Sequence, residues 1–131
     1  MNNNEVMLIT GTRKGIGKYL VEYYVEKDFY VIGCSRSPVD YEFDRYEHFC
    51  LDVSDEDRVK KMFAQIRKSY KRLDVLINNA GLASMNHTLL TPLKTVQKLL
   101  NTNFIGTFLF CREAARISTP PSTSRPHCSL P

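Results

Sequence analysis

The stretch Thr10-Gly11-Thr12-Arg13-Lys14-Gly15-Ile16-Gly17 decides the fold. It follows the apolar run Val6–Ile9, and such a run bounded by glycine is typical of a strand buried on both faces. After it, apolar residues recur at helical spacing to about Lys27, which predicts an amphipathic helix. A glycine turn between a strand and a helix lets backbone N–H groups and the positive helix end approach a phosphate. The stretch therefore predicts a nucleotide-binding turn.

The glycines are spaced G-x-x-x-G-x-G, which differs from the G-x-G-x-x-G of the general dinucleotide-binding pattern. The competing interpretation is a phosphate-binding loop for nucleoside triphosphates. That pattern requires glycine at position 12 and serine or threonine at position 19, where Thr12 and Tyr19 stand. The triphosphate interpretation fails at both positions.

Strand and helix patterns alternate along the rest of the chain. Further strands are expected at 30–34, 48–51 and 73–77, and further helices at 54–70, with Ser54 as N-cap, and from Thr91-Pro92 to about 116. This alternation predicts an α/β fold, a Rossmann-type doubly wound parallel sheet of strand order 3-2-1-4. The predicted sheet is truncated after its fourth strand and the long helix that follows.

The composition changes abruptly at Ser118. Residues 118–131 contain four of the six prolines and no periodic pattern, so we expect a domain over 1–117 and a disordered Pro/Ser-rich tail over 118–131. The backbone edge of Val75–Ile77 is then expected to be unpaired. The abrupt switch also suggests a shifted or truncated reading frame.

The end of the second predicted strand indicates the cofactor. A site for NAD usually places a carboxylate there, whereas this chain has Ser35 and Arg36. A hydroxyl and a guanidinium suit the adenosine 2′-phosphate of NADP, and Arg13 and Lys14 add positive charge nearby. NADP is therefore predicted over NAD; the alternative is that the cations form a solvated surface cluster.

Three further motifs follow in order: Asp52-Val53, Asn78-Asn79-Ala80-Gly81 and Asn103-x-x-Gly106-x-Phe108. Any one of these polar residues alone could be a cap, turn or helix-surface residue. Together with Thr10–Gly17, the motifs give the chain from Val6 to Arg116 a resemblance to the short-chain dehydrogenase/reductase family. The resemblance implies that Asp52 binds the adenine amino group, that Asn79 to Gly81 contact the ribose on the nicotinamide side, and that Asn103 orders a catalytic water. The cofactor-binding residues expected from these patterns are Gly11, Thr12, Arg13, Lys14, Gly15, Ile16, Gly17, Ser35, Arg36, Asp52, Val53, Asn79, Ala80 and Gly81, with Asn103 as the catalytic residue.

The family resemblance also implies hydride transfer between a nicotinamide and a carbonyl or alcohol carbon of a small molecule such as a 3-oxoacyl thioester, sugar or ketone. The family performs it with a Ser and a Tyr-x-x-x-Lys that follow the position of Asn103, and no such pattern occurs there. Tyr23 and Lys27 have the spacing, but they lie in the first predicted helix and receive no catalytic role. Three hypotheses remain: a reductase half that is inactive alone, a non-catalytic dinucleotide-binding module, and a non-functional fragment.

The composition argues against several classes of binding partner. The net charge of +4 is scattered without a basic run, which argues against nucleic acid. The four cysteines and three histidines show no metal-ligand spacing, so no metal site is expected. Neither a signal peptide nor a membrane-spanning run is recognisable, and a cytoplasmic location is the default expectation. Members of the family are commonly homo-oligomers, although an oligomer of this chain is doubtful.

Overall fold

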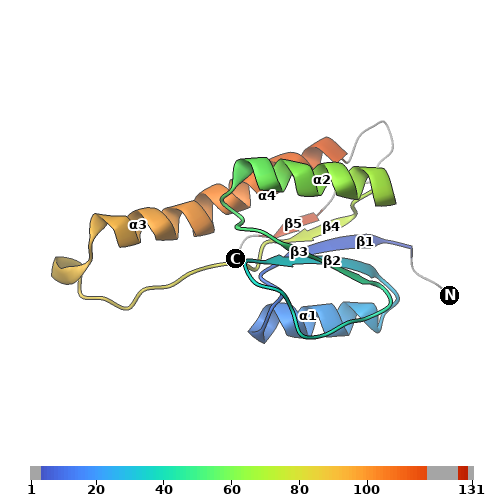
Figure 1. Cartoon of the computed structure of the whole chain (residues 1–131), viewed down its shortest axis with the longest axis horizontal. Helices are drawn as coiled ribbons and strands as arrows, with labels where there is room; N and C mark the ends of the chain where they lie inside the picture. Colours follow the sequence, from blue (N-terminus) through green and yellow to red (C-terminus); the bar gives the residue numbers. More distant parts are fainter. Residues whose placement is uncertain (1–3, 118–126, 130–131) are drawn as a thin grey trace.

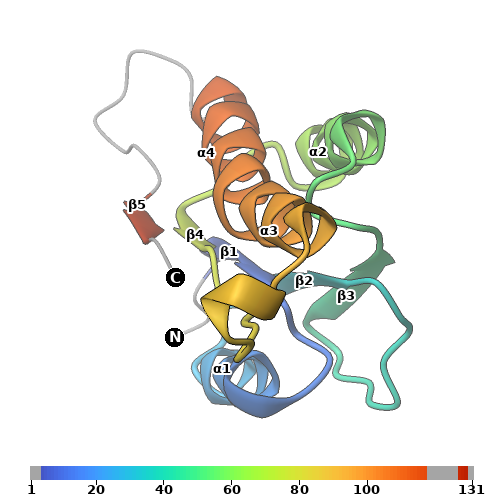
Figure 2. The same cartoon turned by 90° about the vertical axis from the view of Figure 1, so that its left-hand side faces the viewer.

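A computed structural model describes residues 4–117 and 127–129. Within these residues one parallel sheet has the strand order β3-β2-β1-β4-β5, seen almost end-on in Figure 2. The strands are β1 (Val6–Thr10), β2 (Tyr30–Ser35), β3 (Tyr46–Cys50), β4 (Val75–Ile77) and β5 (His127–Ser129). The order of the first four strands confirms the predicted 3-2-1-4 arrangement.

Helices cover both faces of the sheet (Figure 1). Helix α1 (Gly15–Val25) lies on one face, and α2 (Glu56–Tyr70) and α4 (Gly106–Ile117) lie on the other. Helix α3 (Leu93–Leu100) extends beyond the end of the sheet. The alternation of strand and helix periods in the sequence thus corresponds to a layered α/β fold.

Two apolar cores explain why β1 is apolar at every position. Met7 and Ile9 pack with Val21 of α1 on one face, whereas Leu8 packs on the other face with a larger cluster. Successive strand residues point to opposite faces, so a strand covered on both sides must be apolar throughout. In the larger cluster, Phe110 of α4 meets Phe63 of α2 edge to face at 5.4 Å between ring centroids. This aromatic pair joins the two helices above the sheet.

The N-cap of α2 is Asp55 and not Ser54, contrary to the sequence-based expectation. The Asp55 side chain accepts a hydrogen bond from the backbone N–H of Arg58, while Ser54 donates to Asp52 instead. Both residue types are good caps, and the competing acceptor at Asp52 determines which one is used. The helix boundary therefore shifts by one residue.

The long helix expected after Thr91 is divided into three parts. Pro92 takes the N-cap position of α3, a π-helical turn occupies Asn101–Ile105, and α4 follows. Two contacts with the body of the fold are made within the π turn and directly after it. Asn103 bonds to the backbone of Leu82, and a Cβ at Gly106 would come within 2.6 Å of Val53 Cγ2. Helical periodicity could not reveal this, because both contacts are tertiary.

The edge of β4 is paired, which corrects two expectations from the sequence. Val75, Leu76 and Ile77 pair in parallel register with His127, Cys128 and Ser129, so these three residues are strand and not disordered tail. The N–H of Asn78 adds a hydrogen bond of 3.2 Å to the Ser129 carbonyl oxygen. Strand pairing uses backbone groups, which any extended segment can supply, so side-chain composition concealed it. The remainder of the predicted tail, 118–126 and 130–131, lies outside the described residues.

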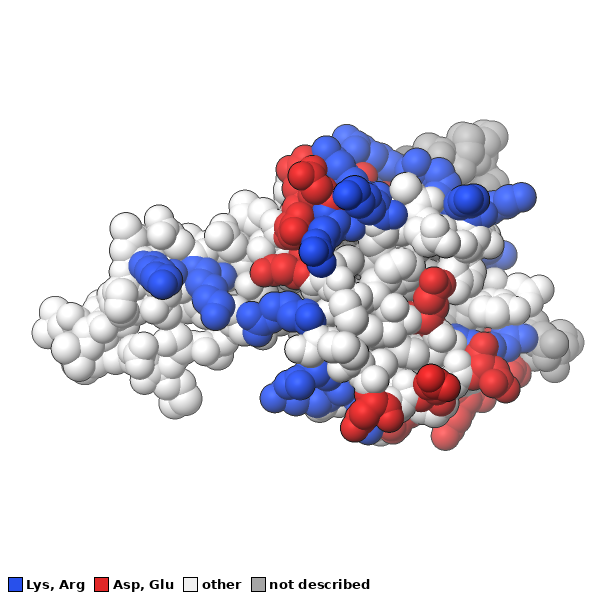
Figure 3. All heavy atoms as spheres, in the orientation of Figure 1, with Lys and Arg blue, Asp and Glu red and all other residues white. Residues whose placement is uncertain are grey.

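The segment that projects from the sheet (residues 83–100) exposes many apolar side chains. Met85 is 100% exposed, and Leu89, Leu90 and Leu93 are at least 70% exposed. Figure 3 shows this projecting segment as mostly uncharged, in contrast to the mixed charges on the body. Among residues 4–117 and 127–129, no helix has the length and apolar character needed to cross a membrane.

Phe110→Ala tests the contribution of the aromatic pair. Phe110 is fully buried, so its truncation should lower the free energy of unfolding by about 3–5 kcal/mol, measured by urea denaturation. Phe108→Ala is the matched control: this ring is 52% exposed on the same helix and should cost less than about 1 kcal/mol. Equal losses for the two variants would contradict the assignment of the core.

Candidate functional site

The glycine turn runs from the carboxyl end of β1 into α1, as expected. Gly11 has a φ of +73°, in the left-handed region that favours glycine. At Gly17 an added Cβ would overlap the carbonyl oxygen of Gly11, so the helix can start at this point only without a side chain there. Lys14 is the N-cap of α1 and supplies no side-chain acceptor for the first amides. These amides can therefore be satisfied by an anion.

The turn is fastened to the loop after β4 through Thr10 and Asn79. The hydroxyl oxygen of the buried Thr10 accepts hydrogen bonds from the N–H groups of Asn79 (3.0 Å) and Ala80 (2.8 Å). The side-chain amide of Asn79 donates to the carbonyl oxygen of Gly11 at 3.2 Å. The turns after β1 and β4 thus form one hydrogen-bonded unit.

A cavity of about 340 Å³ opens at the carboxyl ends of the first four strands. Ligands of open α/β sheets bind in this position. Nine of the expected cofactor residues line it: Gly11, Arg13, Lys14, Ser35, Arg36, Asp52, Val53, Ala80 and Gly81. Residues from separate parts of the sequence therefore meet around a single cavity.

The other five expected residues do not line this cavity. Thr12, Gly17 and Asn79 lie behind the turn and hold its shape. Gly15 and Ile16 are exposed in the first turn of α1. Gly15 and Ile16 are therefore accessible to a ligand, whereas Thr12, Gly17 and Asn79 contribute by fixing the backbone of the turn.

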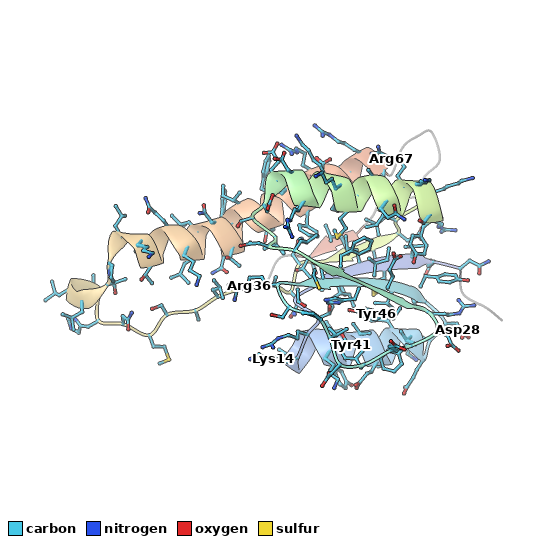
Figure 4. The ribbon with its side chains drawn as sticks, in the orientation of Figure 1. Lys14, Asp28, Arg36, Tyr41, Tyr46 and Arg67 are labelled. Carbon is cyan, nitrogen blue, oxygen red and sulfur yellow. The ribbon has the colours of Figure 1, made fainter. Side chains whose placement is uncertain are left out.

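Positive charge gathers at one side of the cavity. Figure 4 places Lys14 and Arg36 at the same end of the sheet, and Arg13 lines the same cavity. All three side chains are exposed, and within the described part of the chain none forms an ion pair. Their charge is available to a phosphate.

Asp52 contributes a carboxylate to the lining of the same cavity. Partial burial opposes its ionised form, but hydrogen bonds from the N–H and hydroxyl of Ser54 outweigh this effect, with help from the charges of Arg36 and Lys98. The pKa of Asp52 therefore lies below its ordinary value. Both hydrogen bonds use Oδ1, which leaves the lone pairs of Oδ2 for a further donor.

Asn103 lies in the π turn beside a second cavity. Its Oδ1 accepts from the N–H of Leu82, and its Nδ2 donates to the carbonyl oxygen of Leu82, both at 2.8 Å. The side chain therefore holds the loop that joins the two cavities. The second cavity, about 640 Å³, is mainly apolar, with Phe104, Phe108 and Cys111 in its wall. This position suits a group recognised by shape more than by charge.

Sequence analysis missed several residues of the first cavity. Cys34, Ser37, Leu51, Leu82 and Thr102 complete its lining. Each of these residues directly adjoins a motif residue in the sequence, and this adjacency is the only feature of the sequence that could have indicated them. Thr10 was noticed as part of the motif, but its role as double acceptor appears only in the structure.

Tyr23 and Lys27 are remote from both cavities. The Lys27 Nζ lies 5.0 Å from the centre of the Tyr23 ring, and Tyr23 is 42% exposed on α1. The pair therefore forms a surface contact.

Comparison with known proteins gives the family. The family model for the short chain dehydrogenases matches residues 5–119. The chain belongs to this family. A 3-ketodihydrosphingosine reductase of Bacteroides thetaiotaomicron is 32% identical over 108 residues, which are 82% of this chain and 40% of that protein. The chain thus spans less than half the length of this reductase.

Solved structures agree with this assignment. A short-chain dehydrogenase of Leptospira borgpetersenii with bound NAD+ superposes with a TM-score of 0.83 at 25% identity, over 88% of this chain and 46% of that one. ElxO with NADP bound gives 0.78 at 32% identity, over 86% of this chain and 49% of that one. Structures with both nucleotides therefore share this fold.

Thr10→Val tests the link between the two turns. The variant keeps the shape of the residue but removes the acceptor of two half-buried amides, so the free energy of unfolding should fall by about 2–4 kcal/mol. Hydrogen exchange at the Asn79 and Ala80 amides should accelerate more than at the β1 amides. Thr95→Val, on α3, has no comparable hydrogen bond in the described structure and serves as the matched control. Unchanged exchange at Asn79 and Ala80 would refute the link.

Proposed function

We propose that this chain is the cofactor-binding part of an NADP-preferring oxidoreductase. The observation that carries the proposal is the position of Arg36, whose exposed guanidinium lies at the end of β2 beside the cavity. An Arg there accommodates the adenosine 2′-phosphate, whereas a carboxylate would bind ribose hydroxyls. Arg13 and Lys14 support the preference because they add charge on the same side.

The remaining lining residues fit the other parts of the dinucleotide. The uncapped start of α1 would receive the pyrophosphate, and Asp52 would accept a hydrogen bond from the adenine amino group. Gly81 lines both cavities and Ala80 lines the first beside it, and these two residues would contact the ribose next to the nicotinamide. The nicotinamide, which supplies or accepts the hydride, would then extend toward Asn103.

The substrate in the complete reaction would be a small molecule with a carbonyl or alcohol group, such as a 3-oxoacyl thioester, a sugar or a ketone. The 3-ketodihydrosphingosine reductase among the relatives supports carbonyl reduction by its printed activity. In these 131 residues the last tyrosine is Tyr70, so a Tyr-x-x-x-Lys after Asn103 is lacking. We therefore propose that the chain binds the cofactor and does not turn over by itself.

Arg36→Leu should abolish the cofactor preference. Loss of a charge-assisted contact with the 2′-phosphate should weaken NADPH binding about 10- to 100-fold and leave NADH binding within about twofold. Fluorescence or calorimetric titration measures both affinities. Arg67→Leu is the matched control, because Arg67 lies on α2, away from the cavity (Figure 4). Equal affinities for NADPH and NADH in the unaltered chain would refute the preference.

Turnover is the second test. With NADPH and a panel of ketones, sugars and 3-oxoacyl thioesters, the 131-residue chain should show no oxidation of the cofactor above the rate without protein. The physical reason is that, among the residues the structure describes, no tyrosine or lysine lines the second cavity to exchange a proton with the substrate oxygen. Substrate-dependent loss of the absorbance of the reduced nicotinamide would contradict the proposal.

A further inference from the structure

A chain of hydrogen bonds connects the glycine turn to the end of β2 through two side chains of β3. The hydroxyl of Tyr46 lies 2.8 Å from Thr12 Oγ1 and 2.7 Å from Nδ1 of His48. On its other side, Nε2 of His48 lies 3.0 Å from Ser35 Oγ. Tyr41 adds a hydrogen bond to the Thr12 carbonyl oxygen, and Figure 4 shows Tyr41 and Tyr46 together between the sheet and α1. None of the sequence motifs includes Tyr46 or His48.

The hydrogen bonds of Ser35 determine which nitrogen of His48 carries the proton. Ser35 Oγ donates its single proton to the Ser37 carbonyl oxygen, so at its contact with His48 it can only accept, and Nε2 also lies 3.3 Å from that carbonyl oxygen, which accepts only. Burial raises the pKa of Tyr46 well above its ordinary value, and the protonated phenol can donate to Nδ1 of His48. Nδ1 is then an acceptor, and the imidazole proton is on Nε2, from which it is donated to Ser35 Oγ. Ser35 Oγ, already accepting from His48, directs its own proton away from β3, toward the Ser37 carbonyl oxygen.

We propose that His48 is a positioning residue: by donating to Ser35 Oγ it keeps the Ser35 proton off β3, so that an adenosine 2′-phosphate can take this proton over from the Ser37 carbonyl oxygen. This role of His48 rests on the proposed preference for NADP, and His48 itself would touch no part of the cofactor. With the opposite tautomer, Ser35 would donate to Nε2 and would present only lone pairs to the phosphate. The hydroxyl of Tyr46 therefore sets the tautomer of His48, and His48 sets the direction of the Ser35 hydroxyl.

The same geometry links cofactor binding to a proton. His48 is half-buried and lines a third cavity, about 440 Å³, on the outer side of β3, which opens its imidazole to solvent. Burial lowers the pKa of His48 in the free chain. A phosphate dianion next to Ser35 would favour the imidazolium and raise this pKa. Other titratable or charged groups lie on the segments that adjoin His48. Cys34 and Arg36 lie at the end of β2, and Tyr41, Glu42, Tyr46 and Glu47 line the third cavity. Lys18 of α1 lies against the Tyr41 ring.

NADPH binding and protonation of His48 should favour each other. If the bound state has the higher pKa, NADPH affinity rises as pH falls through that value and levels off below the pKa of the free chain. NADH has no 2′-phosphate, so its affinity should not respond to His48. The phosphate itself gains a proton near a pKa of about 6, which weakens NADPH binding in every variant equally. Comparison between variants removes this common effect.

His48→Phe and His48→Gln test the two parts of the inference. In His48→Phe, which has no donor to Ser35, NADPH affinity at pH 8 should fall about three- to tenfold, while NADH affinity stays within about twofold. In His48→Gln, an amide can still donate to Ser35 but cannot titrate, so NADPH affinity at pH 8 should be nearly kept. The ratio of NADPH affinities, unaltered chain over His48→Gln, should then rise about threefold or more between pH 8 and pH 6.

His87→Gln is the matched control, because His87 is an exposed histidine at the N-cap of η1 (Thr88–Leu90), outside all three cavities. It should reproduce the pH profile of the unaltered chain. Retained NADH affinity shows that each variant is folded, and if His48→Phe does not fold, the pH comparison with His48→Gln decides.

The two proposals fail in different ways. If the unaltered chain does not prefer NADPH, the proposed function fails. If it does, and Arg36→Leu removes the preference, but the His48 variants bind NADPH with unchanged affinity and an unchanged pH profile, the role of His48 is overturned and the function stands.

Discussion

The close approach of the backbone at Gly17 to the carbonyl oxygen of Gly11 is the constraint on which the site depends. No side chain fits at position 17, and only with that contact made does α1 begin directly above the end of β1. The side-chain amide of Asn79 then donates to the same carbonyl oxygen, and the Thr10 hydroxyl, directly before the turn, accepts from the backbone N–H of Asn79. A small residue thus brings together two segments that are almost seventy positions apart in the sequence, as the separation of 68 between Asn79 and Gly11 shows.

The turn is supported from a second direction by side chains of β3 and the preceding loop. Thr12 is completely buried, and its hydroxyl and carbonyl oxygens are engaged by Tyr46 and Tyr41. An added Cβ at Gly33 would collide with the Tyr46 ring and hydroxyl, so β2 leaves space for this tyrosine beneath the turn. The backbone that would meet a phosphate is therefore held by polar contacts beneath it, while its upper side stays free. Preorganisation of this kind reduces the entropy that a ligand must overcome on binding.

What the sequence could reveal follows from the range of each interaction. The strands and helices are encoded by local periodicity, and the motifs at 10–17, 35–36, 52–53 and 79–81 indicated residues that the fold brings to one cavity. The position of the cap at Asp55 depended on a competing bond between Ser54 and Asp52, and the π turn depended on contacts of Asn103 and Gly106. His48 has no motif because its partners are a tyrosine two positions away and a serine on the adjacent strand. Strand β5 was concealed because its pairing involves backbone groups alone.

The two cavities differ in how completely this chain builds them. Around the first cavity, the glycine turn, the end of β2 and the loop after β3 are each fixed by hydrogen bonds within the described residues. Around the second, Phe104 and Phe108 present exposed rings, and the apolar surface continues along residues 83–100. Exposed apolar area of this extent is unfavourable in water and is usually covered by protein or ligand. Under the proposed function, affinity for the charged end of the dinucleotide would depend on the first cavity, whereas placement of a substrate would require walls on the second, so that binding and turnover would be separable in this fold.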